Sequence, residues 1–246
     1  MRAARAAGYL LAAIIVGLVW QLASWASGNL IPGPAPAMAY LAGHPGPALG
    51  AVALTLIDAV GGYAVAASLA ILGLAIYELG GLGEPVVESF REVLHSVTPV
   101  AWSLALLILL GFSSRAVPIL VSGLSAFPPL MTSLIEGLKV SRARFGDLAA
   151  ALRLRGVRRM AYIDLPASVP YFISGSRSAI GVALIVSPVA EAFGTAGGIG
   201  YGLYLFFQLH EYAAFVAWSL LLVLVMIVID AAALGPLERW SRRWME

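Results

Sequence analysis

Residues 144–166 read RFGDLAAALRLRGVRRMAYIDLP, and this stretch combines five arginines with two aspartates. The chain of 246 residues around it is 61% hydrophobic and only 11% charged, with a mean hydropathy of +0.91. Several of its apolar runs reach about 20 residues, the length that an α-helix needs to cross a bilayer. The sequence therefore predicts a membrane protein in which the charged stretch lies outside the lipid.

The apolar runs are continuous rather than alternating, which favours membrane-spanning helices over a β-barrel. The first run follows a basic start and resembles a signal peptide, but its length and its bulky far end favour an uncleaved span. We predict one all-α integral membrane domain over 1–246. It has about six transmembrane helices, at 8–26, 50–77, 94–112, 117–136, 169–192 and 213–234.

The placement of arginine and lysine predicts the orientation of the chain. If six spans alternate, Arg2, Arg5, Arg91 and the basic residues of 139–159 and 239–243 fall on one side, and only Arg115 falls on the other. By the positive-inside rule both termini are then cytoplasmic, in a multi-pass protein of the cell membrane. The largest cytoplasmic loop is about 138–168. A simpler interpretation is that its arginines only set topology or contact anionic lipid headgroups.

This loop has helical composition on both sides of Gly156. Arg155 and Arg159 are four residues apart and share one helix face. Gly156 is expected to end the first helix in the left-handed conformation, and Pro166 to stop the second. The sequence thus predicts a helix–turn–helix at the membrane surface, a shape suited to docking another protein.

The same loop resembles the cytoplasmic "EAA" loop of permease subunits in binding-protein-dependent ABC importers. That motif runs Glu-Ala-Ala, three residues, Gly, about nine residues, then Ile-x-Leu-Pro. Counting back from Leu165 and Pro166 places Asp147 at the Glu position and Ala149 at the second Ala. Arg153 stands where the family has its Gly.

This departure changes the expected geometry of the loop, because Gly156 would have to take over the turn from Arg153. The resemblance implies that the loop sits in a groove of an ATPase. Asp147 would then pair with a basic or amide group of the groove, or cap the first helix of the loop. Carboxylates or lipid phosphates would be bound by the loop arginines, which are Arg153, Arg155, Arg158 and Arg159.

Further motifs resemble the nitrate/sulfonate/taurine class of these permeases. A Gly-x-Arg element stands at 175–177, an Ala-Glu pair at 190–191, and a Gly-Ile-Gly-Tyr element at 198–201. The segment 109–139, with Phe-Pro in the predicted fourth span, is similar too. The resemblance covers about 45–240.

Candidates for the translocation pathway or an outer gate are residues whose type is unusual inside a membrane span. An intramembrane aspartate such as Asp58 is costly unless it is paired or hydrated, so it is either functional or hydrogen-bonded across the bundle. Glu191 is expected to hold the backbone of the glycine-rich segment, which is a gate or a flexible loop. Arg177 either reaches the surface or faces the pathway. The full set is Asp58, Pro128, Pro129, Arg177, Ser187, Pro188, Glu191, Gly198, Gly200 and Tyr201.

The resemblance implies a transport subunit that is not itself an enzyme. The chain has no G-x-x-x-x-G-K-[ST] pattern, so ATP and Mg belong to a separate ATPase and this chain is expected to bind no cofactor and no metal. The implied partners are a second permease copy, preferably in a homodimer, two ATPase subunits, an extracytoplasmic solute-binding protein and the lipid bilayer, with no nucleic acid.

The substrate implied by the class is a small anion such as nitrate, a sulfonate or taurine, although the class also includes permeases for cofactor precursors. A secondary transporter is a rival, kept open by the intramembrane carboxyls of Asp58 and Glu191. An intramembrane enzyme is a third, but no nucleophile with a base and no metal cluster is apparent.

Overall fold

The computed structural model describes residues 2–26, 28, 32–78, 81–154, 156–194, 197–229 and 231. Every regular element among them is a helix. In chain order these are α1 (Arg2–Ala26), α2 (Pro34–Gly43), α3 (Pro45–Glu78), α4 (Gly83–Ser96), α5 (Pro99–Leu110), α6 (Ala116–Ala151), α7 (Gly156–Arg159), the π-helical turn η1 (Met160–Asp164), α8 (Leu165–Gly194), α9 (Ile199–Gln208) and α10 (Tyr212–Ile229).

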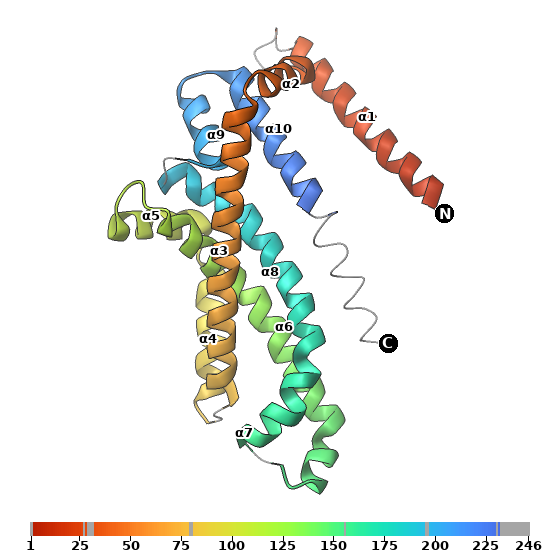
Figure 1. Ribbon diagram of the computed structural model, residues 1–246, viewed down its shortest axis with the longest axis vertical. Helices are drawn as coiled ribbons and strands as arrows, with labels where there is room; N and C mark the ends of the chain where they lie inside the picture. Colours follow the sequence, from red (N-terminus) through yellow and green to blue (C-terminus); the bar gives the residue numbers. More distant parts are fainter. Residues whose placement is uncertain are drawn as a thin grey trace.

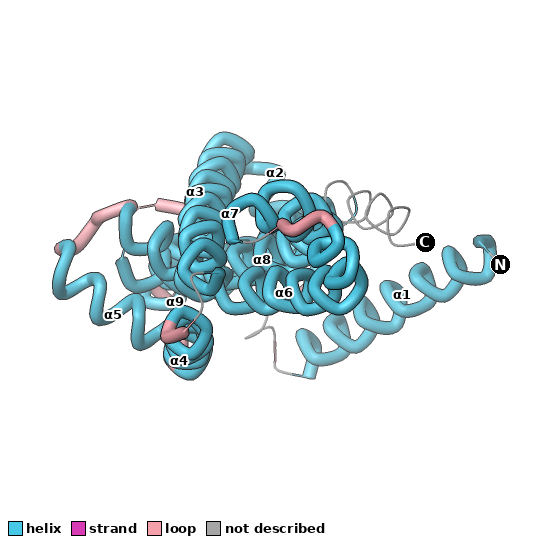
Figure 2. Tube along the Cα trace, turned by 90° about the horizontal axis from the view of Figure 1, so that it is seen from below, coloured by secondary structure: helices cyan, strands magenta, loops and turns pink. Residues whose placement is uncertain are grey.

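Three long helices, α3, α6 and α8, run side by side along the long axis and form the core (Figures 1 and 2). Small residues bring their backbones together. A Cβ on Gly62 of α3 would collide with Ser122 of α6, and one on Gly175 of α8 would collide with Ser133 of α6. In lipid, where helices gain little from the hydrophobic effect, such close approach is the main source of packing energy. A large side chain at Gly175 would force α6 and α8 apart.

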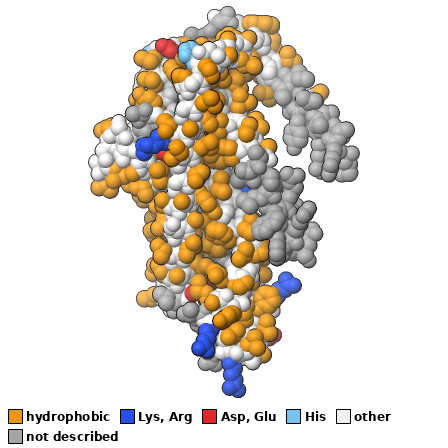
Figure 3. Space-filling view, viewed as in Figure 1, with side chains coloured by type: hydrophobic (Ala, Val, Ile, Leu, Met, Phe, Trp, Pro, Cys, Tyr) orange, Lys and Arg blue, Asp and Glu red, His pale blue; other side chains and the backbone are white. Residues whose placement is uncertain are grey.

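Four helical segments are long and apolar enough to cross a bilayer: α3, α6, η1 with α8, and α10. Many of the large apolar side chains on these helices are exposed on the outside of the bundle. Figure 3 shows apolar side chains along the length of one face, with lysine and arginine gathered at the end where α7 lies. Exposing so large an apolar surface to water is unfavourable, so the chain is a multi-pass membrane protein.

The predicted spans map onto these helices with two differences. Four of them lie on α3, α6, α8 and α10: 50–77, 117–136, 169–192 and the described part of 213–234. The predicted first span lies on α1, which diverges from the other helices in both views (Figures 1 and 2). Its described apolar part, Ile15–Ala26, is shorter than a span.

The prediction of a continuous span over 94–112 is wrong. α4 ends at Ser96, α5 begins at Pro99, and the two axes are bent by 95°. Pro99 cannot donate a backbone hydrogen bond to α4, and the Thr98 hydroxyl oxygen accepts one from the N–H of Ala101 at 3.4 Å, which caps a new helix. The described spans therefore number four, or five if this bent pair is one broken span, rather than six.

The predicted geometry of the charged loop also needs correction. The first helix of the loop is the last part of α6, which ends at Ala151, before Gly156, and the left-handed residue is Arg153, with φ +53°. Asp147 lies inside α6, so it caps no helix N-terminus. Pro166 does not stop a helix, because it is the second residue of α8, where its missing N–H is tolerated. The wider turn of η1 directly before it gives the proline ring room.

Candidate functional site

A largely buried polar cluster joins three parts of the chain. It consists of Thr55 and Asp58 of α3, Arg115 just before α6, and Ser187 and Glu191 of α8. Glu191 of α8 accepts hydrogen bonds from the Thr55 hydroxyl at 2.9 Å and from the Ser187 hydroxyl at 3.2 Å. All three side chains are fully buried or nearly so. A carboxyl in such a place must be hydrogen-bonded, because burial strips it of water.

The same cluster holds the start of α9. The backbone N–H of Gly200 donates to Glu191 at 2.9 Å, and that of Ile199 donates to Thr55 Oγ1 at 2.9 Å. These are two of the N–H groups that a helix N-terminus leaves without a helical partner. Side chains of α3 and α8 thus fix the position of α9, and Glu191 makes the backbone contact that the sequence analysis considered for it.

The glycines at this turn are required by its geometry. Gly198 has φ +98°, and a Cβ there would collide with the Glu191 carboxylate. A Cβ on Gly200 would collide with the carbonyl of Pro188. The described part of the glycine-rich segment is therefore closely fitted against α8, unlike a plain flexible loop. Tyr201 follows, half-buried in the first turn of α9.

Asp58 of α3 is paired across the bundle. Its Oδ1 accepts from Arg115 Nη2 at 2.8 Å, and the same Nη2 donates to the carbonyl of Leu54 at 3.0 Å. Arg115 immediately precedes α6, so the pair fixes the α5–α6 link against α3. The other Asp58 oxygen, Oδ2, is buried without a hydrogen-bond partner among the described residues.

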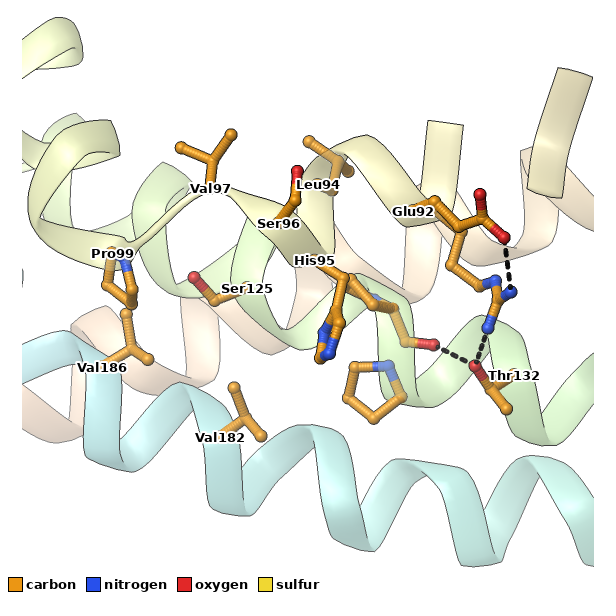
Figure 4. A pocket seen from close by; sticks show the side chains of 13 residues that line it. Glu92, Leu94, His95, Ser96, Val97, Pro99, Ser125, Thr132, Val182 and Val186 are labelled. Carbon is orange, nitrogen blue, oxygen red and sulfur yellow. Dashed lines mark hydrogen bonds and ion pairs between the residues drawn. The ribbon is translucent and has the colours of Figure 1, made fainter. Parts of the chain in front are cut away.

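A second feature is a pocket of about 610 Å³ at the α4–α5 bend (Figure 4). Pro128, Pro129 and Thr132 of α6 form one wall, and Val182 and Val186 of α8 form another. Its volume is in the range of small-molecule sites. Two pathway candidates, Pro128 and Pro129, line it, whereas Ser187 and Pro188 are not part of its lining and are buried.

Arg91 and His95 also line this pocket, and the sequence analysis missed both. It assigned Arg91 to a cytoplasmic loop, but Arg91 lies within α4 and donates from Nη1 to the Thr132 hydroxyl at 2.9 Å. The sequence signal was the spacing of four residues between Arg91 and His95, which puts both on one helix face. Hydropathy alone could not show that this face turns toward α6.

The third feature is the turn between α6 and α7 at the end of the bundle. Asp147 and Arg158 are exposed, while Ala149 is buried. A hollow of about 790 Å³ lies beside the turn and is lined by Gly146, Ala149, Ala150, Arg153, Leu154 and Arg159. Leu165 and Pro166 are exposed at the start of α8. The predicted docking residue Arg155 lies outside the described residues.

Asp164, within the Ile-x-Leu-Pro part of the motif, was also missed. It is fully buried and accepts hydrogen bonds from Ser141 of α6 at 2.7 Å and from Arg159 Nε at 3.1 Å. Arg159 is therefore engaged within its own chain. The signal for this contact was a lone aspartate five residues after an arginine in an otherwise apolar stretch.

The remaining pathway candidate, Arg177, lies half-buried on α8, outside the lining of the pocket and outside the cluster. Among the residues that the structure describes, no group of three or more His, Asp or Glu side chains is arranged to hold a metal ion.

No protein-family profile matches the chain. Curated relatives do match it. The chain is 25% identical over 187 residues to the bicarbonate transport system permease protein CmpB of Synechococcus elongatus, an alignment that covers 75% of this chain and 64% of that protein. It is 30% identical over 132 residues to the nitrate import permease protein NrtB of the same organism, covering 53% of this chain and 45% of that protein.

It is also 29% identical over 138 residues to the putative aliphatic sulfonates transport permease protein SsuC of Bacillus subtilis, covering 53% of this chain and 48% of that protein. Among solved structures, a chain from the crystal structure of an amino acid ABC transporter with histidines has the same fold, with a TM-score of 0.68 and 11% identity over 81% of this chain and 96% of that chain.

The chain is a homologue of ABC transporter permeases. It spans about half to two thirds of the length of these curated relatives. As a permease homologue, it brings together α3, α6, α8 and α9 around one buried polar cluster, and it carries a pocket and an exposed turn at two further places.

Proposed function

We infer that this chain is the membrane-spanning permease subunit of an ATP-driven importer. The observation that carries this inference is the agreement between the relatives, which are transport permeases, and the fold, which is shared with an ABC transporter chain. The pathway runs along the pocket at the α4–α5 bend and is completed by a second copy of the chain. ATP and Mg bind to separate ATPase subunits, and a solute-binding protein delivers the substrate.

The substrate class is a small oxyanion. The names of the relatives refer to bicarbonate, nitrate and aliphatic sulfonates, which share a compact head of negatively charged oxygens. A basic side chain in the pocket, Arg91, fits this class, because guanidinium groups bind such oxygens through paired N–H donors.

The α6–α7 turn docks the ATPase from the cytoplasmic side. Several features suit this role: the turn stands at one end of the bundle (Figure 1), Asp147 and Leu148 are exposed, and a hollow lies beside them. ATP binding would favour one arrangement of the two permease copies only if the docked turn has different contacts in the two arrangements. On this proposal both chain termini are cytoplasmic.

Charge reversal at the exposed Asp147 tests the docking. Asp147→Lys is expected to leave the fold intact but to reduce co-purification of an ABC-type ATPase, and ATP-driven uptake of nitrate, by about tenfold or more, since one hydrogen bond to a charged group is worth about 1.5–3 kcal/mol. The matched control is Asp147→Glu, which keeps the carboxylate and should assemble normally. Normal assembly and uptake by Asp147→Lys would refute the docking site.

A further inference from the structure

Arg91 is a largely buried cation in an apolar helix bundle, because only 27% of its side chain is exposed. Burying a charged side chain is costly unless the charge is paired or hydrated. Ionisable side chains within membrane-spanning bundles usually line a pathway or face a water-filled cavity. Arg91 does so here, because it borders the pocket at the α4–α5 bend.

The contacts of Arg91 hold its guanidinium in place without using up its donors. Nη1 donates to Thr132 Oγ1 at 2.9 Å, and the Thr132 hydroxyl in turn donates to the carbonyl of Pro128 at 2.9 Å. Nε is buried with no hydrogen-bond partner among the described residues. Since a guanidinium has five N–H donors, an oxygen-rich anion could accept from those that remain.

Glu92 does not neutralise this group. Its carboxylate oxygen is 3.8 Å from Arg91 Nη2, beyond hydrogen-bond length, and its side chain is 73% exposed. An ion pair of this kind is screened by water and weak. The other basic side chain in the lining is His95, one turn further along α4, which Figure 4 shows extending from α4 toward α6 and α8. Its imidazole offers at least one N–H donor in either tautomer.

We propose that this pocket is an anion-binding station of the translocation pathway, in which Arg91 and His95 bind the oxyanion head and Thr132 positions Arg91. The apolar walls from Val182 and Val186 strengthen the attraction, because they keep the local dielectric constant low. The proposal deepens the proposed function, since it states where in the pathway the oxyanion is selected. Pro128 and Pro129 lack backbone N–H groups, so two carbonyls in the preceding turn of α6 have no helical donor and would suit a cation instead. An experiment must therefore decide whether the pocket prefers an anion or a cation.

The chain contains no cysteine, so a single reporter thiol can be placed in the pocket as Ser125→Cys. In the purified chain in proteoliposomes, we expect an anionic methanethiosulfonate reagent to react faster with this thiol than a cationic one. Replacing Arg91 as Arg91→Gln should lower the anionic-to-cationic rate ratio by about tenfold, the effect of one unit charge at several ångströms in partly hydrated surroundings. Arg91→Lys keeps the charge and should retain most of the ratio.

Lys139→Gln is the matched control, because Lys139 is an exposed cation within α6 that is paired with Glu88 and does not line the pocket; it should leave the ratio unchanged. A second measurement needs no Arg91 variant. Sodium nitrate should slow the reaction of Ser125→Cys with uncharged N-ethylmaleimide more than sodium gluconate does at equal ionic strength. A ratio that favours the cationic reagent, a ratio indifferent to Arg91, or no protection by nitrate would each overturn the proposal.

These labelling rates require neither the ATPase nor the binding protein. They therefore report on the pocket alone, whereas the Asp147 variants report on assembly and coupling. If the pocket fails this test while Asp147→Glu still assembles and imports nitrate, the proposed function stands and the anion station does not.

Discussion

Glu191 accepts hydrogen bonds from Thr55, Ser187 and the backbone of Gly200 in a place from which water is excluded. Glu191→Ala would leave the Thr55 hydroxyl and the Gly200 N–H without this acceptor, at about 1–3 kcal/mol for each buried donor, while the Ser187 hydroxyl could still donate to the Thr55 carbonyl at 3.5 Å. We expect the variant to melt at a clearly lower temperature in detergent and α9 to become sensitive to protease. Glu191→Gln keeps one acceptor oxygen and should be milder.

The matched control for this prediction is Glu88→Ala, which removes a half-exposed carboxylate paired with Lys139 at 3.8 Å. Such a surface change is expected to cost about 0.5 kcal/mol or less. Equal melting temperatures for Glu191→Ala and Glu88→Ala would show that the buried cluster contributes nothing to stability.

Arg153 holds a left-handed backbone conformation, which costs a residue with a Cβ roughly 1–2 kcal/mol and costs glycine little. Arg153→Gly is therefore expected to match or exceed the thermal stability of the unsubstituted chain, even though glycine loses more entropy on folding. Arg144→Gly, in the exposed interior of α6, should lower stability by about 1 kcal/mol. Thermal unfolding of both variants gives the sign of each change in stability. If Arg153→Gly lost as much stability as Arg144→Gly, the left-handed conformation of Arg153 would be contradicted.

Residue-level prediction from sequence succeeded where a residue's chemistry alone forced its environment. A buried carboxylate needs partners, so Asp58 and Glu191 were recognisable as candidates, and the partners of both are now visible. Prediction from sequence failed where the backbone conformation of a residue depends on contacts with residues far away in the sequence. The motif alignment put Arg153 at the glycine position of the family loop, but arginine at positive φ is so uncommon that the turn was assigned to Gly156. The structure places the turn where the alignment has it.

Among the elements, the α7–η1 segment is tied to α6 by one buried carboxylate. Asp164 accepts hydrogen bonds from Ser141 and Arg159. A displacement of the α6–α7 turn would therefore be transmitted to α8 through this contact. Asp164→Ala should free the segment, and amide exchange over 157–166 is expected to rise by about tenfold or more, a change of about 1.4 kcal/mol in local opening. The control is Glu136→Ala, an exposed carboxylate on α6. Exchange in this segment that is equal in the two variants would refute the tie.

The long elements were predictable because a run of apolar residues permits little else in lipid, and α3 and α10 lie close to the predicted ranges. The α4–α5 bend was not, because hydropathy averages over it. Thr98 and Pro99 carried the local signal of a new helix start, yet proline inside a membrane span is common enough that the signal was read as a kink. That one error assigned Arg91 to a loop, whereas it lies on α4 and lines the pocket.

For the whole molecule, the structure separates the two ends of the bundle: α2 lies at one and α7 at the other (Figure 1). A reporter fused after residue 40 and a reporter inserted in the turn at 152–154 should therefore report opposite sides of the membrane. The positive-inside rule predicts that the turn is cytoplasmic, because lysine and arginine gather at that end (Figure 3). A turn found outside the cytoplasm would invert the proposed orientation and remove ATPase docking with it.

One chain by itself leaves the pocket open, since the lining residues Glu92, His95 and Ser96 are exposed. A translocation pathway must exclude lipid and must not let other solutes leak through. A second copy of the chain is therefore expected to cover this face. Ile185 of α8 is 64% exposed and lies in sequence between Val182 and Val186, which line the pocket. It should then lie near Ile185 of the second copy. In this cysteine-free chain, Ile185→Cys is expected to form homodimer crosslinks that block uptake.

Ile71→Cys is the control for this last prediction, because Ile71 is a similarly exposed apolar residue, 59% accessible, on α3, and does not line the pocket. It should stay uncrosslinked if its face borders lipid. Crosslinks of Ile185→Cys to a different permease chain would replace the homodimer by a heterodimer and keep the shared pathway. Full uptake by a permease shown to be monomeric would exclude a shared pathway, because the open pocket would then have to be closed by something other than a second permease.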